Sequence, residues 1–305
     1  MMSMMSMKNK TLIIILGPTA VGKTSLAIKI AKEKKTEIIS CDSRQFYKEM
    51  SIGTAVPSDE ELKEVRHHFI QHISFNDSYN VGKFEIDALA KLNEIFKKNK
   101  YAVMVGGSGM YINAICNGID NIPKVPIAVR EKIINIYKSK GIEWLQEEVK
   151  KINSENFKNI DNKNPQRLIR SLEVYQHTGK EIHSFYSRDK KTREFNIIKI
   201  GLKLDREILY ERINQRVDNM IDCGLVNEVK SLKEHQLENA MQTVGYREII
   251  NYLNKEISIE ESIENIKKNT RRLAKRQITW FKKDRDIKWF DKNQEKNIKE
   301  FISKL

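Results

Sequence analysis

Residues 11–24 read TLIIILGPTAVGKT, and this stretch decides the fold. Thr11–Leu16 is a continuous apolar run, which is typical of a strand buried in a parallel sheet. Gly17–Thr24 then matches the phosphate-loop pattern G-x-x-x-x-G-K-[ST], and Ser25–Lys34 has the apolar spacing of a helix. A glycine-rich loop between a strand and a helix turns its backbone N–H groups toward an anion. The stretch therefore predicts a polyphosphate site made by Gly17, Pro18, Thr19, Ala20, Val21, Gly22, Lys23 and Thr24.

Within this loop two side chains have distinct predicted roles. Lys23 adds a positive charge on the phosphates, and the Thr24 hydroxyl suits a Mg²⁺ ligand. The pattern indicates a polyphosphate but does not by itself indicate ATP.

The rest of the chain alternates between strand and helix patterns and then changes character. Apolar runs at Glu37–Cys41, Tyr101–Val105 and Ile197–Leu204 predict further strands, with helices at Leu89–Lys98 and Arg206–Met220. Between about Ile112 and Arg193 the strand signals are replaced by amphipathic patterns at Val129–Ser139, Ile142–Lys151 and Pro165–Thr178. We predict an α/β fold: a P-loop NTPase-like parallel sheet (8–113), an inserted all-helical domain (114–195), and a return to the core followed by basic C-terminal helices (196–305).

The charge balance suggests a polyanionic partner. The chain has 55 Lys and Arg against 41 Asp and Glu, a net charge of +14. Nine of these cations and one acid, Asp284, lie in Lys267–Arg285. Ile266, Leu273 and Trp280 recur at heptad spacing and are predicted to dock this helix, leaving its cations exposed. A solvated helical face and a general bias toward Lys, Asn and Ile are the alternatives to an RNA-binding surface.

Other features limit the possibilities. Three widely spaced cysteines favour a reducing compartment, and the longest apolar run is too short to cross a membrane, so we expect a cytoplasmic protein. His68 and His72 lie four residues apart, but no third ligand type converges on them or on His67. We therefore expect these histidines to be structural.

Asp42 follows the second predicted strand, which places it at the carboxyl edge of the sheet beside the phosphate loop. Three roles fit it at this point: a Mg²⁺ ligand, a general base, or a helix N-cap.

Several motifs together resemble one family, the tRNA dimethylallyltransferases. They are GPTAVGKT at 17–24, DSRQFY at 42–47, the pair His67–His68, YNV at 79–81, VGGSGMY at 105–111, NPQRLIRSLEVY at 164–175, VGYREI at 244–249 and RLAKRQITWFKKD at 272–284. The resemblance extends over nearly the whole chain. It departs from the family at Ser108 and Met110, where GGTGLY is usual, and at Gln71, where an Asp is common.

The resemblance implies transfer of a dimethylallyl group from dimethylallyl diphosphate to the 6-amino group of the adenosine 3′ of the anticodon. It implies catalytic roles for Asp42 as base and for Thr19 at the diphosphate beside Lys23, with Mg²⁺ as cofactor and the tRNA anticodon stem-loop as partner of a monomeric enzyme. A second cation is expected from the later helix, and Arg216 in YERINQRVD is the candidate; the alternative is a surface arginine on an amphipathic helix. The resemblance also implies tRNA binding, with Ser43, Arg44 and Gln45 holding the target base; the residues implied are Asp42, Ser43, Arg44, Gln45, Ser108, Arg130, Gln166, Arg167, Arg170, Gly245, Tyr246 and Arg247. On the basic helix we predict RNA contacts from the side chains themselves: Lys275 and Arg276 are cations, Gln277 can hydrogen-bond, and Trp280 can stack on a base or belong to the core.

Two other functions share some of these features. A P-loop kinase would explain the phosphate loop and Asp42 but not the basic C-terminal helix. A nucleotide-hydrolysing RNA-binding switch would need an acid at the end of a strand, and Tyr101–Val105 runs into Gly106–Gly107 instead.

Overall fold

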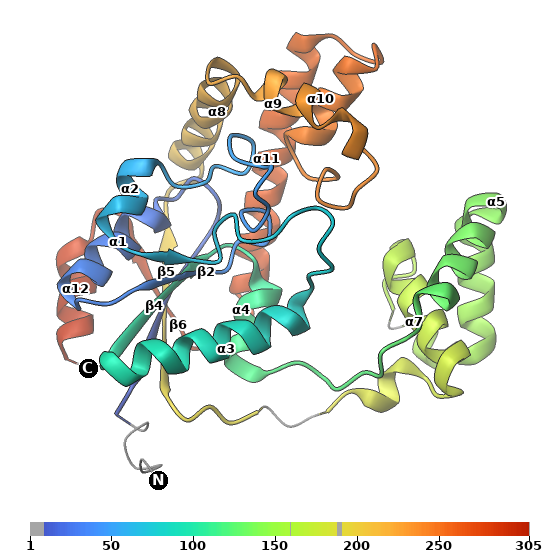
Figure 1. Cartoon of the computed structure of the whole chain (residues 1–305), viewed down its shortest axis with the longest axis horizontal. Helices are drawn as coiled ribbons and strands as arrows, with labels where there is room; N and C mark the ends of the chain where they lie inside the picture. Colours follow the sequence, from blue (N-terminus) through green and yellow to red (C-terminus); the bar gives the residue numbers. More distant parts are fainter. Residues whose placement is uncertain (1–8, 159, 188–190, 305) are drawn as a thin grey trace. The chain divides into compact units, whose positions relative to one another are not determined.

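A six-stranded, fully parallel sheet forms the centre of the protein (Figure 1). The computed structural model describes residues 9–158, 160–187 and 191–304. The order of the strands is β3-β2-β4-β1-β5-β6. Their bounds are β1 (Thr11–Leu16), β2 (Ile38–Ser40), β3 (His67–His68), β4 (Tyr101–Gly106), β5 (Asn196–Lys203) and β6 (Ile287–Asp291).

Helices cover both faces of this sheet. In the unit formed by the residues before 118 and after 191 they are α1 (Lys23–Glu33), α2 (Asp59–Glu64), α3 (Val81–Lys98), α4 (Gly109–Asn117), α8 (Arg206–Asp222), α9 (Leu225–Ser231), η3 (Lys233–His235), α10 (Tyr246–Leu253), α11 (Ile259–Phe281) and α12 (Glu295–Ser303). The side chains of β1 alternate: Ile13 and Ile15 pack with α1, α8 and α12, whereas Ile14 and Leu16 pack with α3 and α4. The result is the three-layer α/β architecture that strand–helix alternation predicts.

The register brings the ends of the central strands to one edge. Leu16 of β1 pairs with Gly106 of β4 on one side and with Gly201 of β5 on the other. Next to them, Cys41 continues β2 by donating its N–H to the Val105 carbonyl at 2.8 Å. The phosphate loop, Asp42 and Gly107–Ser108 therefore all follow strands that end at the same edge of the sheet.

A separate apolar cluster lies among α8, α9, α10 and α11, which Figure 1 shows grouped together. Its buried members include Tyr246, Leu225 and Ile266, together with Met50 from the loop after β2. This cluster fixes α11 beside the loop that contains Met50 and beside the carboxyl edge of the sheet.

The inserted unit spans Gly118–Lys191 and is entirely helical in its described part. It consists of α5 (Ile127–Ile152), α6 (Ser154–Phe157), α7 (Pro165–Thr178) and η2 (Ile182–Phe185). Gly141 interrupts α5 with a left-handed φ of 79°, between the two helices that the sequence predicts there. The predicted range 114–195 encloses this unit. Residues 8, 159, 188–190 and 305 of the predicted ranges lie outside the described residues.

Arg193 ties together the two chain segments from which the insertion leaves and to which it returns. Its Nε donates to the Ile115 carbonyl, and its Nη2 donates to the Ala114 carbonyl and the Glu85 carboxylate, each at 2.7 Å. The Arg193 and Glu85 side chains are 11% and 7% exposed, so the charge pair is largely screened from water. Burial is tolerated because each charge meets an opposite charge or a carbonyl.

The α/β fold class is confirmed, and the strands predicted at 11–16, 37–41, 101–105 and 197–204 are all present within two residues at each end. β3 and β6 were not predicted, because edge strands of two and five residues are too short to show a clear run or alternation of apolar residues. No helix among the described residues has both the length and the apolarity needed to span a bilayer.

Candidate active site

The phosphate loop joins β1 to α1 through three left-handed residues. Gly17 has φ 145° and Gly22 has φ 98°, while Ala20 has φ 64° despite its side chain. A Cβ at Gly17 would lie 2.6 Å from the Leu202 carbonyl oxygen of β5, so only glycine fits there. Gly22 is the N-cap of α1, and no described side chain caps this helix. The first N–H groups of α1 are thus available to an anion, as the sequence predicts.

Basic side chains gather around this loop. The Lys23 ammonium donates to the Pro18 carbonyl at 2.8 Å, and Arg216 on α8 donates to the Thr19 hydroxyl at 3.3 Å. Arg212, one turn earlier on α8, donates to the Ala20 carbonyl at 2.9 Å and was not predicted. Burial, followed by the charge of Arg212, lowers the pKa of Arg216. Because an anion is the natural counter-charge for such a cluster, the loop is suited to diphosphate.

Lys23 gives the site a predicted pH dependence. Burial lowers the pKa of Lys23 to about 8, although the nearby Asp42 carboxylate raises it and Arg216 lowers it further. A lysine is charged below its pKa, so we expect kcat/KM for a diphosphate substrate to fall as pH rises through about 8. Initial rates at limiting diphosphate substrate between about pH 6 and 10 measure this. Lys23→Arg, which stays charged, should remove that alkaline limb; a limb that persists in Lys23→Arg would assign it to another group.

Asp42 occupies the turn after β2 and faces the phosphate loop. Its Oδ1 accepts the Arg44 N–H at 3.1 Å, so it closes a local turn rather than capping a helix. The next residue, Ser43, meets Ser108 after β4: the Ser43 N–H and hydroxyl lie 3.3 and 3.4 Å from the Ser108 hydroxyl. Arg44 donates to the Asn239 carbonyl at 3.1 Å.

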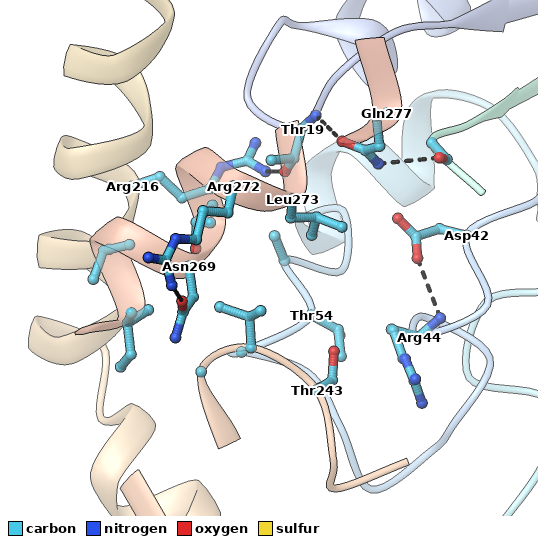
Figure 2. Close-up of a pocket in the computed structure, with 18 of the residues that line it drawn as sticks. Thr19, Asp42, Arg44, Thr54, Arg216, Thr243, Asn269, Arg272, Leu273 and Gln277 are labelled. Carbon is cyan, nitrogen blue, oxygen red and sulfur yellow. Dashed lines mark hydrogen bonds between the residues drawn. The ribbon is translucent and has the colours of Figure 1, made fainter. Parts of the chain in front are cut away.

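A cavity of about 510 Å³ opens between these elements. Figure 2 shows Asp42 on one side of it and Arg216 and Arg272 on the other, with Thr19 and Gln277 closing one end. Its volume is within the usual range for ligand pockets. Ten predicted site residues line it: Thr19, Asp42, Ser43, Arg44, Ser108, Arg216, Gly245, Arg247, Arg276 and Gln277. Lining residues that were not predicted include Gly53, Thr54, Thr243, Asn269 and Arg272.

Gln277 on α11 links the phosphate loop to the loop after β4 (Figure 2). Its Oε1 accepts the Thr19 N–H at 2.8 Å and its Nε2 donates to the Gly107 carbonyl at 3.0 Å. Both polar ends of this side chain are therefore used within the protein, and contact with a base would compete with them. Gln277 also lines the cavity.

The predicted docking pattern of α11 is wrong at its C-terminal end. Ile266, Ala274 and Phe281 are the buried apolar residues, whereas Trp280 is 49% exposed and Leu273 is half-buried in the cavity wall. Helical geometry explains the shift, since a straight helix drifts from a strict seven-residue repeat. The exposed Trp280 ring packs directly against the backbone of Gly109. Lys275 and Arg276 are exposed, as predicted.

Glu228 on α9 supports the cavity wall and was missed by the sequence. Its carboxylate accepts the N–H groups of Ser51, Ile52 and Gly53 at 3.0, 2.8 and 3.1 Å, and the Tyr246 hydroxyl at 2.5 Å. Tyr246 is fully buried, so its side chain is a core group in this structure and a direct contact with RNA would require it to leave the core.

Gln45 has a similar supporting position. Its amide donates to the carbonyls of Thr54 and Ala55 at 3.2 and 2.8 Å, and it is not among the cavity-lining residues. The resemblance implies that Gln45 holds the target base, but in the structure its N–H donors are used by the loop that lines the cavity.

Glu228→Gln is expected to lower the free energy of unfolding by about 2 kcal/mol, because the amide NH₂ would face backbone N–H donors. Urea denaturation measures this change. Glu234→Gln serves as the matched control, since Glu234 is 82% exposed and should shift stability by less than about 0.5 kcal/mol. Equal stabilities for the two variants would contradict a supporting role for Glu228.

The predicted sites on the inserted unit form a group of their own. Arg130 on α5 donates to Gln166 on α7, and both Arg130 and Arg170 donate to Glu173 on α7. Arg167 is exposed next to them in the sequence. Their relation to RNA stays a prediction.

The residues near the phosphate loop fit a divalent cation that is carried by phosphate. Mg²⁺ usually keeps several waters and takes one or two protein oxygens together with phosphate oxygens. Thr24 at the start of α1 and Asp42 across the loop provide such oxygens. The described residues contain no group of three or more His, Cys, Asp or Glu that would hold a metal without phosphate.

A phosphate loop at the carboxyl edge of a parallel sheet, opening into a cavity with one carboxylate and several guanidinium groups, defines an enzyme that acts on a polyphosphate substrate. The IPP transferase family model matches residues 45–284. The tRNA dimethylallyltransferase of Christiangramia forsetii is 52% identical over 292 residues, covering 95% of this chain and 97% of that protein. The one from Flavobacterium psychrophilum is 51% identical, covering 92% and 93%.

Solved structures agree with these relatives. The full-length tRNA isopentenylpyrophosphate transferase from Bacillus halodurans matches with a TM-score of 0.71 and 35% identity, covering 97% of this chain and 96% of that one. A eukaryotic dimethylallyltransferase that acts on tRNA matches with a TM-score of 0.78 and 27% identity, covering 93% and 74%. The chain belongs to the IPP transferase family, the tRNA dimethylallyltransferases.

Proposed function

We propose that this protein transfers the dimethylallyl group of dimethylallyl diphosphate to the 6-amino group of the adenosine 3′ of the anticodon in tRNA. The observation that carries the proposal is the shared cavity into which the phosphate-loop residue Thr19, Arg216 and the Asp42 carboxylate all face. We further propose that the protein works as a monomer in the cytoplasm with tRNA.

The phosphate loop holds the diphosphate of the donor. Backbone N–H groups at the start of α1, the Lys23 ammonium and the Arg216 guanidinium oppose the charge that develops as the C–O bond to the diphosphate breaks. Mg²⁺ bound through Thr24 and diphosphate oxygens would neutralise part of the same charge. The electron pair of the broken bond leaves with the diphosphate.

Asp42 serves as the base on the opposite side of the cavity. The amine nitrogen of adenine forms the new C–N bond, and its proton passes to the Asp42 carboxylate. Ser43, Arg44 and Ser108 lie at the same wall and would position the base, which must leave its stack to reach this depth. Arg247, Arg272 and Arg276 would meet phosphates at the cavity mouth.

Labelled dimethylallyl diphosphate, Mg²⁺ and an unmodified anticodon stem-loop test the proposal together. Label should enter RNA that carries adenosine 3′ of the anticodon, and should not enter the same loop with guanosine at that position. ATP in place of the donor should transfer nothing to RNA. Phosphorylation of a small acceptor by ATP, without label in RNA, would favour a kinase and overturn the proposal.

A further inference from the structure

The inserted unit contains a buried carboxylate that holds two surface arginines. Glu173 on α7 is 2% exposed. Its Oε2 accepts Nη1 of Arg130 at 2.8 Å, and its Oε1 accepts Nη1 of Arg170 at 2.6 Å. One arginine comes from α5 and the other from α7, so the carboxylate joins the two helices. A buried charge is costly unless it is paired, and here each oxygen has its own guanidinium.

The arginines themselves remain accessible. The Arg130 and Arg170 side chains are 36% and 37% exposed, and each retains N–H groups that Glu173 does not take. Arg130 uses another nitrogen, Nη2, to donate to Gln166 Oε1 at 2.7 Å. The Glu173 contacts therefore fix the direction of each guanidinium plane without covering it.

Further groups nearby in the same unit suit RNA. Arg167 is exposed on α7, and Tyr186 is 47% exposed. Burial raises the pKa of Tyr186, and so does the charge of Asp120, while the charges of Arg167 and Arg170 lower it. One guanidinium group can donate to two phosphate oxygens at once, and an exposed tyrosine can stack on a base or ribose.

We propose that Glu173 is a positioning residue for RNA binding, whose carboxylate pre-orients Arg130 and Arg170 toward the phosphates of tRNA. The inference rests on the proposed function of the chain as a tRNA-modifying enzyme. Long arginine side chains lose conformational entropy when they bind RNA. If they are already held in the binding orientation, less entropy is lost on binding and the affinity is higher. From net charge alone, removing the negative charge of Glu173 should strengthen the binding of a polyanion. The positioning role predicts the reverse, namely weaker RNA binding.

The test is the affinity of Glu173→Gln for an unmodified anticodon stem-loop, measured by fluorescence anisotropy at several NaCl concentrations. We expect Kd to rise about tenfold. The slope of log K against log salt should become shallower by about 0.7–0.9 for each RNA phosphate that the variant no longer neutralises. Glu147→Gln is the matched control, because it makes the same charge change at an exposed position of α5. This control should bind RNA as tightly as the parent or more tightly.

One double variant separates the possible failures. Arg130→Gln with Arg170→Gln should weaken RNA binding at least as much as Glu173→Gln. If the double variant binds like the parent, the inserted unit does not contact RNA there and the inference fails, while label transfer by the parent still tests the proposed function. If the double variant is weak but Glu173→Gln binds like the parent, only the positioning role is overturned.

Glu173→Asp protects the test against misfolding. It keeps the charge and one pairing, but its shorter side chain cannot reach both helices. It should also raise Kd while its far-UV circular dichroism spectrum at the assay temperature matches that of the parent. Unchanged affinity of a folded Glu173→Asp variant would contradict the proposal.

Discussion

Asp42→Asn is expected to lower kcat for dimethylallyl transfer by about 10²–10⁴-fold. The amide has the size of the carboxylate, and its oxygen can still accept the Arg44 N–H that closes the turn. It cannot take up the proton that the adenosine amine loses as the C–N bond forms. Initial rates at saturating donor and RNA give kcat directly, and RNA affinity should change little because the turn is preserved.

Asp42→Ala distinguishes the structural role of Asp42 in the turn from its role as proton acceptor. This variant loses both the proton acceptor and the bond to Arg44, so it should match Asp42→Asn in kcat and in addition bind RNA more weakly. A kcat of Asp42→Asn within about threefold of the parent value would rule out Asp42 as the general base. Recovery of Asp42→Asn by raised Mg²⁺ would instead support the metal-ligand role that the sequence also allows.

Arg216→Gln is expected to lower kcat by about 10²–10³-fold, the usual cost of removing one donor that stabilises developing charge. Arg216 donates to the Thr19 hydroxyl at 3.3 Å and lines the cavity, so in the proposed reaction its guanidinium would face the leaving diphosphate. Its contribution grows as the C–O bond breaks, and the loss should therefore appear in kcat more than in donor affinity. Single-turnover rates of label transfer measure it.

Arg212→Gln is the matched control on the same helix. Arg212 contacts the phosphate loop at the Ala20 carbonyl but is not part of the cavity lining. We expect a loss of kcat of less than about tenfold for Arg212→Gln. Equal losses in the two variants would show that the total positive charge around the loop matters rather than a guanidinium aimed at the diphosphate.

The sequence predicts those elements that are specified by residues close together in the chain. A buried strand, a glycine-rich turn and an amphipathic helix each leave a periodic pattern, which is why β1, α1 and α7 were found with nearly correct bounds. The edge strands β3 and β6 were missed because two and five residues are too few to show a period. The heptad prediction placed Trp280 in the docking face, whereas helix geometry places Phe281 there.

Long-range contacts explain the gaps in the predicted site. Glu228 lies far along the chain from the Ser51, Ile52 and Gly53 N–H groups that it accepts, and no spacing rule connects them. For the same reason Gln45 and Tyr246 were predicted at the base and at the RNA, although their polar atoms support the cavity wall. Motif resemblance indicates which residues matter, while only the folded chain shows whether each one contacts the cavity or supports it.

The Arg193 contacts have a consequence for modularity. Because Arg193 bonds to the carbonyls of Ala114 and Ile115, the chain re-enters the core close to the place where it leaves. Gly118–Lys191 is therefore an insertion between two core segments that hydrogen bonds already hold close together. The entropy of closing such a loop grows only with the logarithm of its length, so the core tolerates large changes in the size of the insertion. The inserted unit can thus diversify in length and sequence while the catalytic sheet stays the same.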